Sequence, residues 1–121
     1  MSLAPFQSLG APRVLTLVRL RPLGVPVRLD AAQQRALFEA TAPAYLQVPG
    51  LLRKLFLAGD QGAGGWYEWE TRAAGEAWFS PAWAERLRSR YAVEPLLEWF
   101  EAPCLVDAVA QQVWIAEGPG H

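Results

Sequence analysis

The sequence has few residues that could hold a metal or form a disulfide. Among its 121 residues there is one cysteine, Cys104, and one histidine, His121. A single cysteine excludes an intrachain disulfide and a cysteine-based zinc site. The carboxylates form no calcium-loop pattern. We therefore expect no metal site, and a reducing, cytoplasmic location.

Long apolar runs and an excess of one charge are also absent. No segment approaches the roughly 20 uninterrupted apolar residues that a membrane helix needs. The net charge of −1 argues against a nucleic-acid-binding surface. The opening residues lack a cationic start, and three helix-breaking residues interrupt their apolar run, so they are not a signal peptide. We expect one globular domain without a nucleic-acid or membrane partner.

Four strands are predicted from the alternation of side chains. Residues 13–20, RVLTLVRL, are apolar on both alternations, which is typical of a central strand covered on both faces. Residues 51–59 and 64–71 form a predicted hairpin around GDQGA. Its glycines do not indicate a phosphate loop, because a strand follows them. The fourth strand spans 95–108 with a bend at Pro103, and there we expect Cys104 to be buried and unreactive.

The first helix is predicted from its cap. Asp30 begins a capping-box spacing, D-x-x-Q. The helix then carries Leu37, Phe38 and Thr41 inward until Pro43 interrupts it. At that point Thr41 can cap a restarted helix, which ends at the sequence VPG.

Two further helical segments follow the third strand. Thr71 is the predicted cap of residues 72–79, RAAGEAWF. Ser80 supplies the cap of the next helix, whose first turn contains a proline. Trp83, Leu87 and Tyr91 lie four residues apart and therefore share one face of this helix, opposite a charged, solvated face.

The order strand, helix, strand, strand, helix, strand predicts an α+β, ferredoxin-like βαββαβ fold with a four-stranded antiparallel sheet. Helices on one side leave the other face of the sheet uncovered, although the strands are apolar on both alternations. A second copy of the chain is the simplest cover. We expect a homodimer that forms a dimeric α/β barrel, with a flexible tail at 1–12, the domain at 13–108 and a C-terminal extension at 109–121.

Three segments carry a resemblance to a known family: PGLLRKLFL, GGWYEWETRAAGEAWFSPAW and RLRSRYAVEPLLEWFEAPCLVD. They resemble the YdhR-like mono-oxygenases of the dimeric α/β-barrel superfamily, which are related to the antibiotic-biosynthesis monooxygenases. The similarity extends over roughly residues 13–107. Its hallmarks are PGL before the second strand, GG-aromatic-x-WE in the third, SPAW at the helix start and RY-x-VEP before the fourth strand.

The resemblance implies a homodimer with a pocket between sheet and helices in each subunit. It also implies oxidation of flat phenolic polyketides by molecular oxygen without a bound metal or flavin. In that chemistry the substrate anion is the electron donor. The protein helps to remove a proton and holds the carbanion in a dry aromatic cage.

The chain departs from this family in its histidines. Many relatives carry histidines around the short second helix, where this chain has Trp78 and Trp83. The only histidine, His121, leaves no haem ligand within the domain, and a histidine base is missing too. Two hypotheses therefore stay open. One is a cofactor-independent monooxygenase that acts on a small, flat aromatic or polyketide-like molecule. The other is a non-catalytic dimeric domain that binds a small apolar ligand.

Residues 64–83 hold most of the tryptophans, and these side chains either pack the core or an interface, or line a pocket. Tyr67 and Trp69 share one face of the third strand. We predict them as the catalytic pair, because the Tyr67 phenol can hold a ligand oxygen and the Trp69 ring can flatten the cavity around a planar substrate. The further pocket residues predicted are Phe38, Phe56, Trp78, Phe79, Trp83 and Tyr91.

Glu68 lies on the other face of the same predicted strand. A carboxylate on a central strand needs a partner, solvent or a dimer contact. An ion pair with Arg53 or Lys54 on the neighbouring strand is the simplest of these.

Overall fold

A computed structural model describes residues 6–25 and 28–118. Its larger sheet contains β2 (Arg13–Pro22), β3 (Leu51–Gly59), β4 (Gly62–Trp69) and β5 (Val93–Ala102). The strand order is β3-β4-β2-β5, and every neighbouring pair is antiparallel. The sequential connections and this order are those of a ferredoxin-like fold, so the predicted fold class is confirmed.

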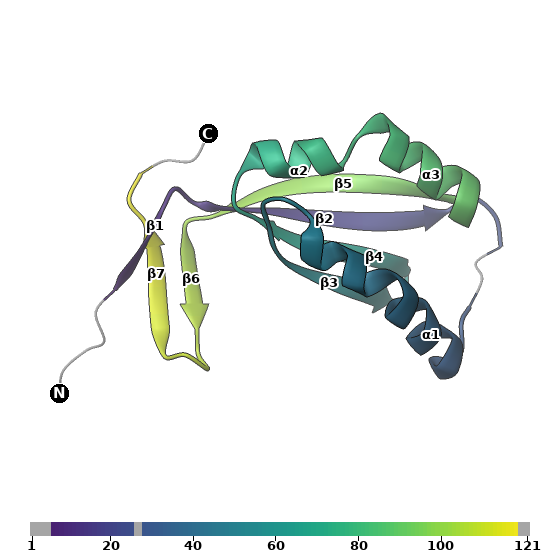
Figure 1. Ribbon diagram of the computed structural model, residues 1–121, viewed down its shortest axis with the longest axis horizontal. Coiled ribbons are helices and arrows are strands. Elements are labelled where there is room, and N and C mark those ends of the chain that lie inside the picture. The colour runs from purple at the N-terminus through teal and green to yellow at the C-terminus, as the bar shows by residue number, and fades with distance from the viewer. Residues whose placement is uncertain (1–5, 26–27, 119–121) are drawn as a thin grey trace.

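The helices cover one face of this sheet (Figure 1). They are α1 (Ala31–Thr41), the 3-10 helix η1 (Ala42–Gln47), α2 (Arg72–Trp78) and α3 (Pro81–Tyr91). The α2 and α3 helices lie over β2 and β5, whereas α1 lies beside β3 and β4. No residue of α1 is buried, so this helix covers its part of the sheet only loosely.

The helix caps agree with the sequence at three positions. The Asp30 side chain accepts a hydrogen bond from the Gln33 amide at 2.8 Å, and the Gln33 side chain accepts one from the Asp30 amide at 2.9 Å, which completes the capping box. Thr71 and Ser80 cap α2 and α3. These side chains satisfy amides that a helix start leaves without partners.

The predicted cap at Thr41 is wrong. Its hydroxyl donates to the Leu37 carbonyl at 2.8 Å, one turn back in α1. The chain therefore passes from α1 directly into η1, and no side chain caps the restart.

The β3–β4 hairpin is confirmed, with a tighter turn than the expected loop. Gly59 pairs with Gly62, so that only Asp60 and Gln61 form the turn. Gly62 has a φ of 126°, a conformation that a side chain would strain.

A bulge at the start of β3 decides which side chains face the helices. Leu51 pairs with Trp69, but Arg53 already pairs with the next residue of β4, Glu68. The extra residue reverses the alternation. Leu51 and Lys54 therefore share the helix-covered face, while Arg53 points to the opposite face.

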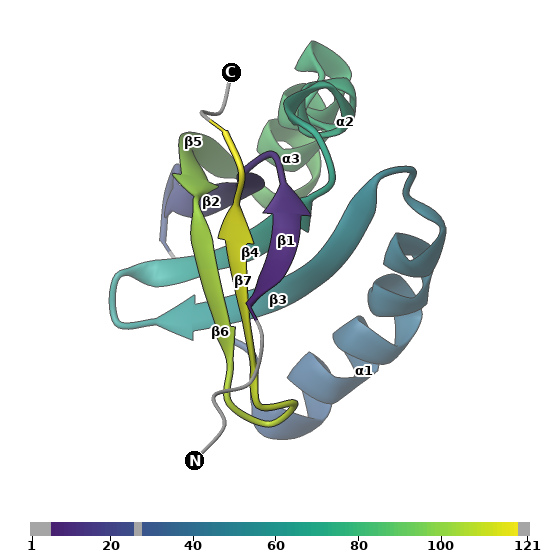
Figure 2. The ribbon, with the colours of Figure 1, turned by 90° about the vertical axis from the view of Figure 1, so that its left-hand side faces the viewer.

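A second, three-stranded sheet joins segments from both ends of the described chain. It contains β1 (Gln7–Gly10), β6 (Cys104–Asp107) and β7 (Gln112–Ala116) in the order β1-β7-β6. The β1 and β7 strands are parallel, and the small sheet runs across the strands of the larger one (Figure 2). It takes residues from the segments expected as the 1–12 tail and the 109–121 extension.

The fourth predicted strand continues differently from the prediction. It ends at Ala102, and Pro103 turns the chain into β6 of the second sheet. The Pro103 carbonyl accepts a hydrogen bond from the Ala116 amide at 2.8 Å. Cys104 is exposed in the described chain, so the expectation that it is buried is wrong.

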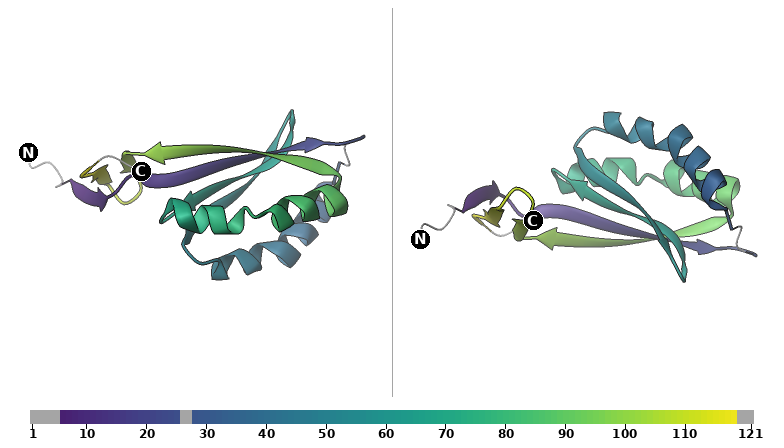
Figure 3. Two further views of the ribbon diagram at one scale, coloured as in Figure 1. Left: turned by 90° about the horizontal axis from the view of Figure 1, so that it is seen from above. Right: turned by 90° about the horizontal axis from the view of Figure 1, so that it is seen from below.

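The core lies between the helices and the larger sheet. Its buried apolar residues are Val18, Tyr67, Trp69 and Trp83. The opposite face of the sheet carries no helix in the described chain (Figure 3). The core is therefore one-sided, and both β2 and β4 contribute to it.

Candidate functional site

The aromatic layer between sheet and helices has two parts, which meet at Tyr67. We call Trp69, Phe79, Trp83 and Trp99 the closed cluster. We call Tyr45, Lys54, Phe56, Tyr67 and Trp78 the polar cluster. The Tyr67 and Trp69 rings are stacked with centroids 5.7 Å apart, so the two clusters are in contact.

The closed cluster is hydrogen-bonded and tightly packed. Trp69 has no exposed surface, and its indole N–H donates to the Thr16 hydroxyl at 3.0 Å. Phe79 packs edge-on against Trp83 at 4.8 Å and against Trp69 at 5.7 Å. These contacts are those of core packing. The Trp69 ring is closed to a ligand in this structure.

The polar cluster is centred on Tyr45, which no sequence signal had marked. Its ring lies 5.4 Å from that of Trp78, 5.6 Å from Phe56 and 6.4 Å from Tyr67, measured between centroids. Phe38 of α1 covers the outer side of Phe56 at 4.9 Å. The cluster therefore joins η1, α2 and two strands. Phe38 of α1 packs against its outer side, but Phe56 stays 37% exposed.

The two phenols of this cluster stay protonated. Burial raises the pKa of Tyr67 far above its ordinary value, and the neighbouring Tyr45 raises it further, while the Trp78 indole lowers it. Burial also raises the pKa of Tyr45. Both phenols therefore remain protonated throughout the physiological range.

Trp78 holds a buried donor without a partner. Its indole N–H lies near enough to Tyr67 to lower the pKa of that phenol. This N–H nevertheless has no hydrogen-bond partner of ordinary geometry among the described residues. Trp78 thus differs from Trp69, whose N–H is satisfied by Thr16.

Lys54 brings an amine into these aromatic surroundings. Its Nζ lies 3.5 Å from the ring centroid of Tyr45, 4.0 Å from that of Phe56 and 4.7 Å from that of Tyr67. Among residues 6–25 and 28–118 no carboxylate forms an ion pair with it. Burial lowers the pKa of Lys54 to about 7. A large fraction of this amine is therefore neutral near neutral pH.

Of the two predicted partners of Glu68, the structure selects Arg53. The guanidinium forms a two-pronged ion pair with the buried carboxylate, with Nη2 3.1 Å from Oε1. Lys54 lies on the other face because of the bulge. The sequence contains one signal for Lys54 as a candidate site residue, since it is the only lysine in the chain.

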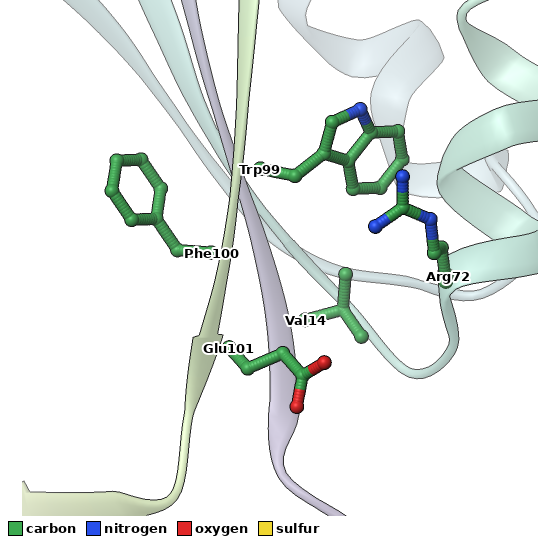
Figure 4. Close-up of a pocket in the computed structure, with 5 residues that line it drawn as sticks. All are labelled: Val14, Arg72, Trp99, Phe100 and Glu101. Atoms are coloured by element: carbon green, nitrogen blue, oxygen red, sulfur yellow. The ribbon is translucent and has the colours of Figure 1, made fainter. Parts of the chain in front are cut away.

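A cavity of about 270 Å³ lies beside the polar cluster. It is formed by the segment before β3 and by α2, and its lining residues are Val48, Pro49, Gly50, Ala74, Ala77 and Trp78. A smaller cavity, of about 110 Å³, lies near the start of α2, where the Arg72 guanidinium stacks on Trp99 at 4.4 Å (Figure 4). Tyr67 and Trp69, expected on a pocket floor, line neither of these two cavities.

The remaining pocket residues predicted from the sequence are divided between the two clusters. Trp78 lines the larger cavity. Phe38 and Phe56 lie at the polar cluster, whereas Phe79 and Trp83 belong to the closed cluster. Tyr91, at the end of α3, is 48% exposed. The helix face shared by Trp83 and Tyr91 is therefore buried only at its beginning.

The described residues contain no cluster of three or more histidine, cysteine or acidic side chains that could hold a metal. His121 lies outside the described residues. Among the helices described, none is long and apolar enough to span a membrane.

Comparisons with known proteins found similar folds only among solved structures. No protein-family model matches the chain, and no curated protein matches it. SnoaB, a cofactor-independent oxygenase from Streptomyces nogalater, is 20% identical with a TM-score of 0.49, over 75% of this chain and 93% of SnoaB. A SnoaB variant with one substitution is 21% identical with a TM-score of 0.48, over the same shares of the two chains.

A third similar structure is a monooxygenase from the gene ActVA-Orf6 of Streptomyces coelicolor in complex with nanaomycin D. It is 20% identical with a TM-score of 0.46, over 74% of this chain and 86% of that protein. The likeness concerns the fold and assigns no residue of this chain a role.

Proposed function

We propose that the protein is a cofactor-independent monooxygenase that oxidises a small, flat aromatic or polyketide-like substrate with molecular oxygen. The observation that carries the proposal is the position of Trp78, which lines the larger cavity and holds an unpartnered buried N–H beside Tyr67. A buried donor without a partner costs about 1–3 kcal/mol. A ligand oxygen that accepts this hydrogen bond removes the cost.

The volume and the lining of the cavity suit a ligand of modest size. Its volume of about 270 Å³ is near the lower end for small-molecule sites. Gly50, Ala74 and Ala77 offer no side chain beyond Cβ on the wall beside the Trp78 ring. A substrate of a few fused rings can lie against this indole.

The proposed reaction balances without an external reductant. A ring methylene next to a phenol becomes a carbonyl, one atom of dioxygen enters the product, and the other leaves as water. The substrate first loses a proton, and its anion then supplies the electrons. The N–H of Trp78, which has no partner among the described residues, donates a hydrogen bond to the developing oxyanion. The closed cluster keeps water away from one side of the site.

The test is oxygen uptake with a panel of hydroxylated naphthalenes and anthracenes, under labelled dioxygen, after treatment of the protein with a chelator. We expect one labelled oxygen atom in the product of at least one compound. Trp78→Phe, which removes the N–H and keeps a ring, should raise KM, and Trp114→Phe in β7 is the matched control. Label-free product, or equal uptake without protein, contradicts the proposal.

A second candidate function is ligand binding without turnover. It is favoured by the burial of Tyr67, which is only 3% exposed and lines neither of the two cavities described above. In this case a flat apolar probe quenches tryptophan fluorescence saturably, and Trp78→Phe weakens the quenching. No compound of the panel then increases oxygen uptake.

We also propose that the chain forms a homodimer through the uncovered face of the larger sheet. This proposal is supported by the apolar side chains there, since Leu55, Leu57, Leu96 and Phe100 are each between 37% and 46% exposed. Sedimentation should show a dimer at micromolar concentration, and Leu55→Asp should dissociate it. A wild-type chain that sediments as a stable monomer contradicts this arrangement.

A further inference from the structure

The proposed oxidation needs a base, and the domain contains no histidine. We propose that Lys54 is this base: its amine takes a proton from a flat aromatic ligand bound at the polar cluster. The proposal rests on the proposed function. Lys54 lines neither of the two cavities described above, but it belongs to the polar cluster, which meets the larger cavity at Trp78. It also predicts a proton-transfer activity that needs neither oxygen nor a redox step.

The backbone directs Lys54 into this position. The bulge between Leu51 and Arg53 turns Lys54 to the helix-covered face, where it pairs with Tyr67 of β4. Gly65, next on that face, leaves room for the lysine side chain. A Cβ at Gly65 would lie 3.4 Å from Cε of Lys54 and 3.0 Å from the Tyr67 ring.

The groups that face the amine of Lys54 are aromatic rings and not carboxylates. Tyr45 from η1, Phe56 from β3 and Tyr67 from β4 surround its amine. Two residues of α3 affect the pKa of Tyr45: Tyr91 raises it and Arg86 lowers it. No carboxylate forms an ion pair with Lys54 in the described chain, so no anion holds the amine protonated.

The same surroundings accommodate the product of proton transfer. Burial brings the pKa of Lys54 to about 7, the range in which a general base is most effective at neutral pH. Once the amine is charged, the faces of the Tyr45 and Phe56 rings attract the ammonium ion. The free base is thus available before the step, and the cation is stabilised after it.

Proton abstraction can be measured with 5-nitrobenzisoxazole, a flat aromatic compound. The amine of Lys54 takes the proton from carbon, a carbon–nitrogen triple bond forms, the nitrogen–oxygen bond breaks, and the electron pair leaves on a coloured phenolate. No oxidant takes part. We expect saturable elimination whose kcat/KM rises with pH and levels off above about 7.

The variants separate a base from a packing residue. Lys54→Met and Lys54→Arg should each lower kcat/KM roughly 100-fold, a typical contribution of a general base. In the double variant Arg53→Lys with Lys54→Met, the amine returns on the opposite face of β3, and elimination should stay low. Added ethylamine should restore part of the rate in Lys54→Ala. Circular dichroism checks that each variant is folded.

A second measurement uses the fact that Lys54 is the only lysine. Reductive methylation of the wild-type protein should be half-maximal in rate near pH 7, and peptide mapping separates Lys54 from the chain amino terminus. Titration of Lys54 at the ordinary value of a lysine, above pH 10, overturns the proposal. So does the absence of elimination, or equal elimination by wild type and Lys54→Met.

The two proposals can fail separately. If elimination depends on Lys54 but no compound of the panel increases oxygen uptake, Lys54 is a base and the monooxygenase proposal is wrong. If Lys54→Met leaves oxygen uptake unchanged, the monooxygenase proposal stands and Lys54 is not its base.

Discussion

The closed and polar clusters are built from similar residues, but they differ in how their polar atoms are satisfied. Trp69 is fully buried and its N–H donates to Thr16. The indole N–H of Trp78 is also buried, yet it has no hydrogen-bond partner among the described residues. A high density of aromatic side chains is therefore not by itself the mark of a pocket. The polar atoms left without partners distinguish the part that can bind a ligand.

The clusters also differ in charge. The closed cluster contains no ionisable side chain, whereas the polar cluster holds Lys54 between aromatic rings. Burying a charge without a counter-ion lowers stability. The polar cluster should therefore stabilise the fold less than the closed cluster.

The largest expected effect is that of truncating the closed cluster. Trp69→Ala should lower the free energy of unfolding by about 4 kcal/mol, because it removes a fully buried ring and leaves a cavity. Trp78→Ala should lower it by less than half as much. Urea denaturation of both variants measures the difference, and equal losses would remove the distinction between the clusters.

The next effect concerns Lys54 and has the opposite sign. The pKa of Lys54 is lowered to about 7 in the folded state, from 10.5. Between these values the unfolded chain binds more protons, so wild-type stability should rise with pH from about 7 to about 10.5. Below pH 7 the buried amine is charged, and Lys54→Met should be more stable by about 2 kcal/mol, after allowance for partial exposure.

Denaturation of wild type and Lys54→Met at pH 6, 8 and 10 tests this prediction. The variant should lose most of the pH dependence above 7. Parallel stability curves for the two proteins would show that Lys54 is not desolvated.

A smaller loss is expected at Thr16. Thr16→Val keeps the shape of the side chain but removes the acceptor of the Trp69 N–H, and it should lower stability by about 1–2 kcal/mol. Thr16→Ser keeps the hydroxyl and serves as the control. If valine and serine have the same effect, the hydrogen bond contributes nothing beyond packing.

The smallest effect on stability is expected at Trp78. Trp78→Phe removes a donor that has no partner, so the free energy of unfolding should change by less than about 1 kcal/mol. The same variant should bind a flat aromatic probe several-fold more weakly. Thermal denaturation and fluorescence titration of one preparation give both values, and a large loss of stability would place Trp78 with the closed cluster.

Local chemistry made much of the fold predictable. Asp30, Thr71 and Ser80 cap their helices because each side chain bonds to an amide within three residues. The hairpin glycines and the alternation of the strands are local signals too. Together they fixed the order of the elements, and therefore the sheet.

The site was less predictable because it depends on pairing between distant segments. The bulge that turns Lys54 inward exists only in the register with β4, and alternation alone left Lys54 and Arg53 equivalent as partners of Glu68. Tyr45 lies in an irregular 3-10 segment without periodicity. Trp69, a predicted catalytic residue, proved to be satisfied by Thr16, which is 53 residues away in the sequence.

The parallel pairing of β1 with β7 also bears on how the chain folds during synthesis. Gln7 leaves the ribosome early, but its partner Trp114 follows only after all strands of the larger sheet have been made. Contacts between such distant segments form slowly because a long loop must close. The nascent chain can thus complete its ferredoxin-like sheet while β1 is still unpaired. The small sheet is then the last part to close, and it fastens together the two ends of a domain that is already folded.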